Sequence, residues 1–118
     1  MQNAAENSQN QSRVTLFDAK ERFYFCRKML DDLGEKVEAL AGKRHPGVVD
    51  LMHQFSLLRS ISMQASQKIE NKDSKDDHRP LKPRALATIE QFEYLVHDFK
   101  EILGEAYEEL CDYEEREQ

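Results

Sequence analysis

The sequence predicts an all-α fold: an up-down-up antiparallel bundle of three long helices that pack like a coiled coil. Along three segments, apolar residues recur at alternating steps of three and four, the spacing of helices that pack lengthwise. The 118 residues are enough for one domain with a core. Four Gly, three Pro and no Trp argue against a turn-rich β protein.

The first helix is predicted over residues 15–42. Thr15 and Asp18 fit a capping box, in which each side chain accepts a hydrogen bond from the backbone N–H of the other residue. Gly42 is expected to end the helix in a left-handed conformation. Residues 1–13 are polar and rich in amides, so a disordered tail is expected before it. The apolar seam of the helix is Leu16, Ala19, Phe23, Cys26, Leu30, Leu33, Val37 and Leu40.

Two further helices are predicted over residues 46–71 and 84–116, so that the bundle occupies residues 14–118. Pro46 suits the first position of a helix, and the short connection before it makes the first two helices antiparallel neighbours. The connection over residues 71–83 holds two prolines and mixed charges and is expected to be an exposed loop. The alternative architecture opens the same helices out and pairs them between two chains. The second seam is Val48, Leu51, Phe55, Leu58, Ser62, Ala65 and Ile69, and the third is Ala85, Ile89, Phe92, Val96, Phe99, Leu103, Ala106, Leu110 and Tyr113.

Charge and cysteine content exclude several functional classes. The net charge is −6, and its acidic surplus lies in residues 100–118. We therefore expect no nucleic-acid binding, which needs clustered Lys and Arg, and no membrane binding, which needs a basic amphipathic face or a long apolar run. The predicted helices place Cys26 and Cys111 too far apart for a disulfide, so free thiols and a cytoplasmic location are expected.

Large apolar residues beside the seams indicate a binding surface. The first and third helices begin at the same end of the predicted bundle, so these residues are expected to converge there and bind a partner. Alternatively, the polar tail or the 71–83 loop covers them, or a wider bundle buries them. The acidic end of the chain is either a solvated helix end or a docking strip for a basic partner. The candidate partner-binding residues are Phe17, Tyr24, Phe25, Met29, Tyr94, Leu95 and Ile102.

The sequence predicts no catalytic residues, cofactor, metal site or small-molecule substrate. It contains no Gly-rich phosphate loop and no CxxC, HExxH or GxSxG motif. Glu93, His97 and Glu101 follow one another at steps of four on one helical face. Because no second helix carries a matching set, we expect a solvent-exposed ladder of ion pairs on this face.

One short segment offers an enzymatic alternative. His97-Asp98-Phe99-Lys100 resembles the His-x-Leu-Lys-Gly core of histidine phosphotransfer domains. The resemblance implies a helical bundle that carries a phosphoryl group on His97. It covers four residues, and Glu101 stands where those domains have glycine.

Together these features predict a non-enzymatic interaction module: a small adaptor, regulator or chaperone-like inhibitor that binds another protein or itself through an aromatic-rich helical face. The first alternative is a structural homo-oligomer that buries that face in its own dimer seam. The second is the phosphotransfer protein that uses His97.

Overall fold

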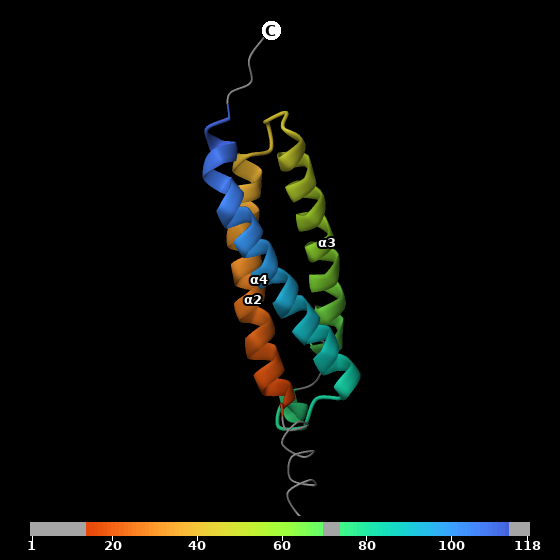
Figure 1. Cartoon of the computed structure of the whole chain (residues 1–118). Coiled ribbons are helices and arrows are strands. Elements are labelled where there is room, and N and C mark those ends of the chain that lie inside the picture. The colour runs from red at the N-terminus through yellow and green to blue at the C-terminus, as the bar shows by residue number, and fades with distance from the viewer. Residues whose placement is uncertain (1–13, 70–73, 114–118) are drawn as a thin grey trace, which may run out of the picture.

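The computed structural model describes residues 14–69 and 74–113 of the chain. They form three long helices, α2 (Leu16–Ala39), α3 (Pro46–Ile69) and α4 (Pro83–Cys111), and a short 3-10 helix, η1 (Ser74–Asp76). Each long helix packs against the other two. The chain runs up in α2, down in α3 and up again in α4 (Figure 1). The predicted antiparallel three-helix bundle is confirmed.

Helix α2 begins as predicted and ends earlier. Thr15 Oγ1 accepts a hydrogen bond from the Asp18 N–H at 3.1 Å, and Asp18 Oδ2 accepts one from the Thr15 N–H at 3.2 Å, so the capping box is present. The helix was predicted to reach residue 42 but ends at Ala39, and no described glycine has a positive φ, so the role predicted for Gly42 is wrong. Successive tight turns, including a bond from the Leu40 N–H to the Val37 carbonyl, close the helix without a left-handed residue.

Helix α3 starts at Pro46 as predicted. The Nδ1 atom of His45 accepts a hydrogen bond from the Gly47 N–H at 2.9 Å, which satisfies one free donor of the first turn. The last described residue of α3 is Ile69. Helix α4 runs from Pro83, one residue before the predicted start, to Cys111, so it ends before residues 112 and 113, which were predicted to be helical. The predicted tail (1–13) and the predicted helical residues 70, 71 and 114–116 lie outside the described residues.

The connection between α3 and α4 is attached to the bundle at one buried residue. Its described part returns to the start of α2, where Thr15 and Pro80 form an isolated β-bridge. The Leu81 N–H donates to the Val14 carbonyl at 2.7 Å, and the Leu81 side chain is buried. Lys20 also binds Asp77 at 2.8 Å. Most described residues of the connection are exposed, and what the prediction lacked is its attachment to the bundle through one buried leucine and a set of backbone hydrogen bonds.

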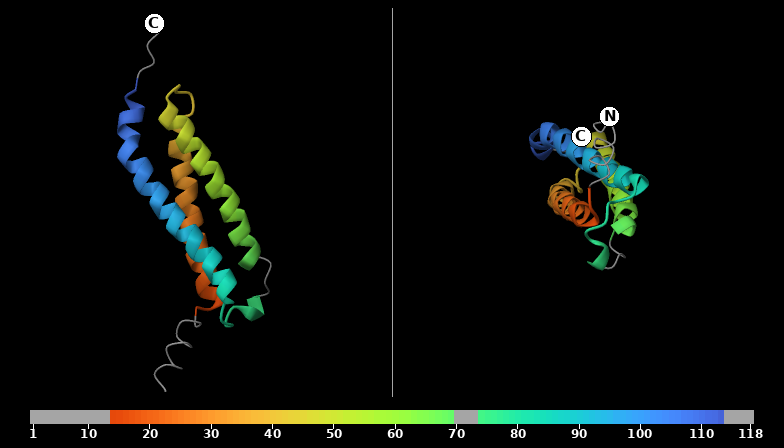
Figure 2. Two further views of the ribbon diagram at one scale, coloured as in Figure 1. Left: turned by 45° about the vertical axis from the view of Figure 1, so that its right-hand side comes forward. Right: turned by 90° about the horizontal axis from the view of Figure 1, so that it is seen from below.

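The core lies between the three helices, which form a triangle when seen end-on (Figure 2). All eight predicted seam residues of α2 are buried, and the predicted polar member of the α3 seam, Ser62, is buried as well. Phe55 differs from its seam neighbours because it is only partly buried. Its ring packs on Gly34 of α2, where a Cβ atom would lie 2.6 Å from Phe55 Cζ.

Candidate interaction surface

The seven predicted binding residues fall into two groups. Four are exposed: Phe17 (49%), Tyr24 (46%), Phe25 (65%) and Tyr94 (69%). The other three, Met29, Leu95 and Ile102, are partly buried and pack against the core. The four exposed residues, three of which lie on α2, are therefore the better candidates for contact with a partner, because an exposed side chain buries more apolar area on binding.

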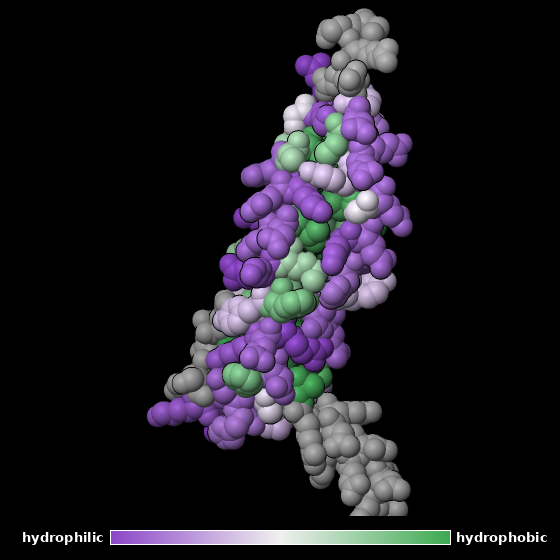
Figure 3. All heavy atoms as spheres, turned by 90° about the vertical axis from the view of Figure 1, so that its left-hand side faces the viewer, coloured by the Kyte–Doolittle hydropathy of each residue, from purple (hydrophilic) through white to green (hydrophobic). Residues whose placement is uncertain are grey.

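Tyr24 and Phe25 line a shallow hollow between α2 and α4. Glu93 and His97 of α4 line the same hollow, together with Arg22 of α2. The Tyr24 ring meets the buried ring of Phe23 edge-on, with centroids 5.4 Å apart. Figure 3 shows the α2 and α4 side of the molecule, where apolar side chains form an interrupted band between hydrophilic ridges. We call Phe17, Tyr24 and Phe25 the aromatic surface.

A charged clamp joins the two helices beside the aromatic surface. Arg22 donates two hydrogen bonds to the Glu93 carboxylate, from Nε at 2.8 Å and from Nη2 at 2.6 Å. Glu90 lies 3.9 Å from the same guanidinium group. The hydrogen bond to Glu93 raises the pKa of Arg22 above its ordinary value, so the group stays charged. This two-point contact fixes α2 relative to α4 where the aromatic residues are presented.

The clamp changes the interpretation of the predicted Glu93, His97 and Glu101 ladder. Glu93 binds across the helices to Arg22 instead of pairing along α4. His97 and Glu101 are exposed. Among residues 14–69 and 74–113, no three His, Cys, Asp or Glu side chains are grouped to hold a metal ion.

Leu95 lies on a different side of the bundle from the aromatic surface. It lines a groove of about 170 Å³ between α3 and α4, together with Leu57 and Ile61. Ile102 follows Leu95 by seven residues and so lies on the same face of α4. The predicted residues occupy two surfaces, and the reason is helical geometry. Each residue of a helix points about 100° from the one before it, so Glu93 and Leu95, two positions apart on α4, point in nearly opposite directions, Glu93 toward α2 and Leu95 toward α3.

The exposed apolar residues of α3 are not among the predicted binding residues. Four large hydrophobic side chains of this helix are exposed: Val49, Met52, Leu57 and Met63. One signal in the sequence could have found them. Helix α3 has only three charged residues among its 24, whereas α2, which has the same length, has eleven. Depletion of charge is a mark of surfaces that become buried.

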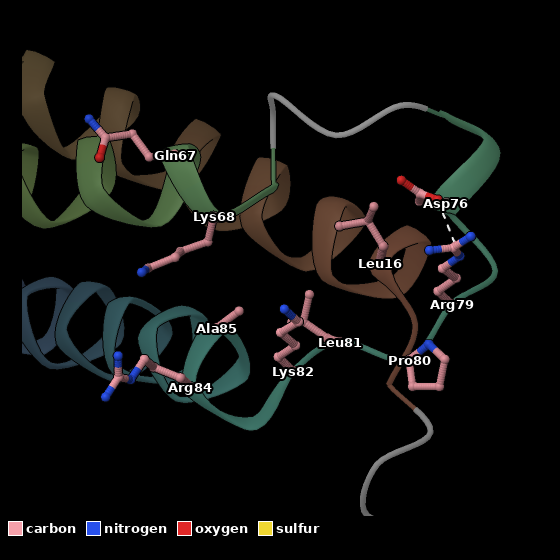
Figure 4. Close-up of a pocket in the computed structure, with 10 residues that line it drawn as sticks. All are labelled: Leu16, Gln67, Lys68, Asp76, Arg79, Pro80, Leu81, Lys82, Arg84 and Ala85. Carbon is pink, nitrogen blue, oxygen red and sulfur yellow. Dashed lines mark ion pairs between the residues drawn. The ribbon is translucent and has the colours of Figure 1, made fainter.

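A cavity of about 510 Å³ lies at the end of the bundle where α3 finishes and α4 begins (Figure 4). Leu16, Leu81 and Ala85 form its apolar wall. Its rim is mostly basic, and one of the basic groups, Arg79, binds Asp76 at 3.2 Å. This charge favours anionic groups over cationic ones. The four basic lining residues are Lys68, Arg79, Lys82 and Arg84.

The two thiols are free, as predicted, and their surroundings differ. Cys26 is buried, and this burial raises the pKa of its thiol. Cys111 is exposed near the end of α4, where its hydrogen bond raises the pKa of the Tyr107 hydroxyl. Burial therefore denies Cys26 the access that a reactive thiolate needs.

Comparisons of the chain with protein-family models, with curated proteins and with solved structures find no match. No helix within residues 14–69 and 74–113 combines the length and the apolarity needed to cross a bilayer.

Proposed function

We propose that this protein is a non-enzymatic interaction module that binds a protein partner through the aromatic surface of α2. The observation that carries the proposal is the exposure of Phe25, at 65%, beside the half-exposed ring of Tyr24. Adjacent aromatic side chains bury a large area at small entropic cost and are enriched among the residues that dominate binding energy.

The surroundings of the aromatic surface support this function. The clamp between Arg22 and Glu93 holds α2 and α4 together beside it, so the two rings are presented on a rigid support. Glu21 and His97 line the edge of the same hollow and would supply polar contacts at the rim. Apolar anchors would provide the affinity, and the rim charges would provide register and association rate.

The test is a double substitution, Tyr24→Ser with Phe25→Ser. Both side chains are substantially exposed, so helicity by circular dichroism should remain at the wild-type level. Proteins captured by the wild-type chain in cells should be lost from the variant. The matched control is Met63→Ser, which removes an equally exposed apolar side chain from α3 and should leave capture unchanged.

Two outcomes would overturn the proposal. If the double variant unfolds, Tyr24 and Phe25 belong to the core. If capture survives the double substitution and is lost with Met63→Ser, the partner binds α3. A photo-reactive amino acid in place of Phe25 should also cross-link to the same partner, because it would sit within the contact.

A further inference from the structure

One face of α3 carries an unusual order of side chains. The residues on this face, starting at Asp50, follow one another at alternating steps of four and three, which is the spacing of a coiled-coil seam. The face is separate from the core seam, and four of its members, Gln54, Leu57, Ile61 and Lys68, line the cavities beside α4. We call this set the α3 stripe; it consists of Asp50, Gln54, Leu57, Ile61, Gln64 and Lys68.

The α3 stripe is complementary to itself when read backwards. Its residues form three pairs that are symmetric about position 59: Asp50 with Lys68, Gln54 with Gln64, and Leu57 with Ile61. The outer pair joins two opposite charges, the next pair joins two side-chain amides, and the central pair joins two apolar side chains. In an antiparallel pair of helices, residues related in this way lie opposite each other.

We propose that two copies of this chain pair through antiparallel α3 helices, with the two-fold axis at the level of residue 59. Asp50 of each copy then meets Lys68 of the other, and the two leucine–isoleucine pairs form the centre. The contact would extend over about 27 Å of helix, from eighteen steps of about 1.5 Å. This inference concerns another surface and does not depend on the proposed function.

Four of the six residues of the α3 stripe are exposed, which suits such a contact, and Gln54 and Ile61 are partly buried. Leu57 is 54% exposed although it lies at the centre, and Asp50, Gln64 and Lys68 at the outer positions are exposed too. Lys68 forms no ion pair with another residue of the described ranges and extends from α3 toward α4 (Figure 4). Pairing would give this ammonium group a carboxylate partner.

The amide layer also has the required hydrogen-bonding capacity. Gln54 Nε2 donates to Asp50 Oδ2 at 3.0 Å within one chain. The Gln54 carbonyl oxygen therefore remains to accept from the Gln64 amide of the second copy. The bond to Asp50 orients the Gln54 side chain, so Asp50 and Gln54 form one hydrogen-bonded pair at each end of the contact.

The groove between α3 and α4 extends the apolar centre beyond one helix. Leu57, Ile61 and Leu95 line it, and Leu95 stands at the level of the proposed axis because it shares the groove with both of the others. A leucine from the second copy could enter this groove as a knob enters a hole. The partly buried Leu95, predicted to bind a partner, would then serve the dimer.

The remaining charge of α3 does not oppose the pairing. If Arg59 belonged to the α3 stripe, its positive charge would face Arg59 of the second copy, because residue 59 is level with the two-fold axis. Arg59 instead lines the groove toward α2, near Asp31 and Glu35. Parallel pairing is disfavoured, since it would place Asp50 against Asp50 and Lys68 against Lys68.

The first test is solution mass by light scattering, from low micromolar concentration upward. The wild-type mass should rise from 13.8 kDa toward twice that value. Leu57→Glu should raise the dissociation constant at least about a hundredfold, because it places two like charges at the centre. Met63→Glu is the matched control: Met63 is also exposed on α3 but points away from the stripe, and its substitution should change nothing.

Charge reversal provides a second test that does not depend on Leu57. Lys68→Asp should weaken association about tenfold, and adding Asp50→Lys in the same chain should restore it, because the end pairs are re-formed with exchanged signs. A wild-type chain that stays monomeric, or a failure of the double reversal to restore the dimer, would overturn the proposal. So would loss of the dimer in the Tyr24→Ser, Phe25→Ser variant, which would place the seam on the aromatic surface.

Orientation is tested by cross-linking in a Cys111→Ser background. Chains with Gln54→Cys mixed with chains with Gln64→Cys should form disulfide-linked dimers under mild oxidation. Either variant alone should not, because equivalent positions would lie about 15 Å apart along antiparallel helices, beyond disulfide reach. Cross-linking of Gln54→Cys to itself would show the helices to be parallel and the assignment to be wrong.

Discussion

The ring of Phe55 packs directly on Gly34, so α2 and α3 approach at a position where any side chain would collide with the ring. A Cβ atom on Gly34 would lie 2.6 Å from Phe55 Cζ and 3.3 Å from Cε1. Phe55 also faces the buried Phe99 ring, with centroids 6.1 Å apart, which limits how far it can withdraw. Gly34 therefore sets the spacing of the two helices at this level.

We expect Gly34→Ala to lower the free energy of unfolding. Alanine favours a helix interior by about 1 kcal/mol over glycine, but overpacking costs about 1–3 kcal/mol, so the net loss should be about 1 kcal/mol. Urea denaturation measures it. Gly104→Ala on α4 is the control: it meets open space and should stabilise the fold by about 1 kcal/mol. Equal stabilisation by both substitutions would contradict the contact.

The clamp between Arg22 and Glu93 should contribute measurably to stability. Arg22→Met or Glu93→Gln should each lower the unfolding free energy by about 1 kcal/mol, since the contact is two-pointed and partly buried. A double-mutant cycle should assign most of this loss of unfolding free energy to the interaction between Arg22 and Glu93. Arg79→Met provides the comparison, because Arg79 is 70% exposed in its pair with Asp76 and should have almost no effect. A zero coupling energy for Arg22 and Glu93 would refute the clamp.

Leu81 should anchor the connection between α3 and α4. Because its side chain is buried against the core, Leu81→Ala should cost about 2–3 kcal/mol of unfolding free energy. Lys75→Ala, in the exposed part of the same connection, should leave the thermal midpoint unchanged. Hydrogen exchange provides a second readout, since the Leu81 N–H bonded to Val14 should lose protection in the Leu81 variant. Full tolerance of Leu81→Ala would mean that the connection is not docked.

The two cysteines should differ sharply in reactivity. Burial excludes reagents from Cys26 and raises the pKa of its thiol, so less thiolate is present at any pH below that pKa. At pH 8 a thiol-specific reagent should modify one cysteine per chain quickly and the second only after denaturation. Cys111→Ser should abolish the fast phase, and a fast phase that survives this substitution would place Cys26 at the surface.

Much of the fold could be predicted because burial follows the period of a helix. The alternation of three and four predicted the seams, of which all eight residues of the first and most of those on α3 and α4 are buried, and Thr15 with Asp18 predicted where α2 begins. The prediction that Gly42 ends the first helix was wrong because α2 ends in tight right-handed turns that need no left-handed glycine. The buried role of Leu81 was missed because a lone leucine among prolines and charges has no periodicity.

The sequence by itself determined three helices, the residues they bury and an excess of apolar side chains beyond the core. Only the tertiary structure decided how that excess is distributed, with Phe25 beside α4 and Leu95 in the groove toward α3. It also decided that Glu93 binds Arg22 of α2 instead of its neighbours on α4. The reason is physical. Periodicity defines the buried side of each helix, but the contacts between helices depend on the rotation and axial offset of each helix, which are settled only when all three helices pack around one core.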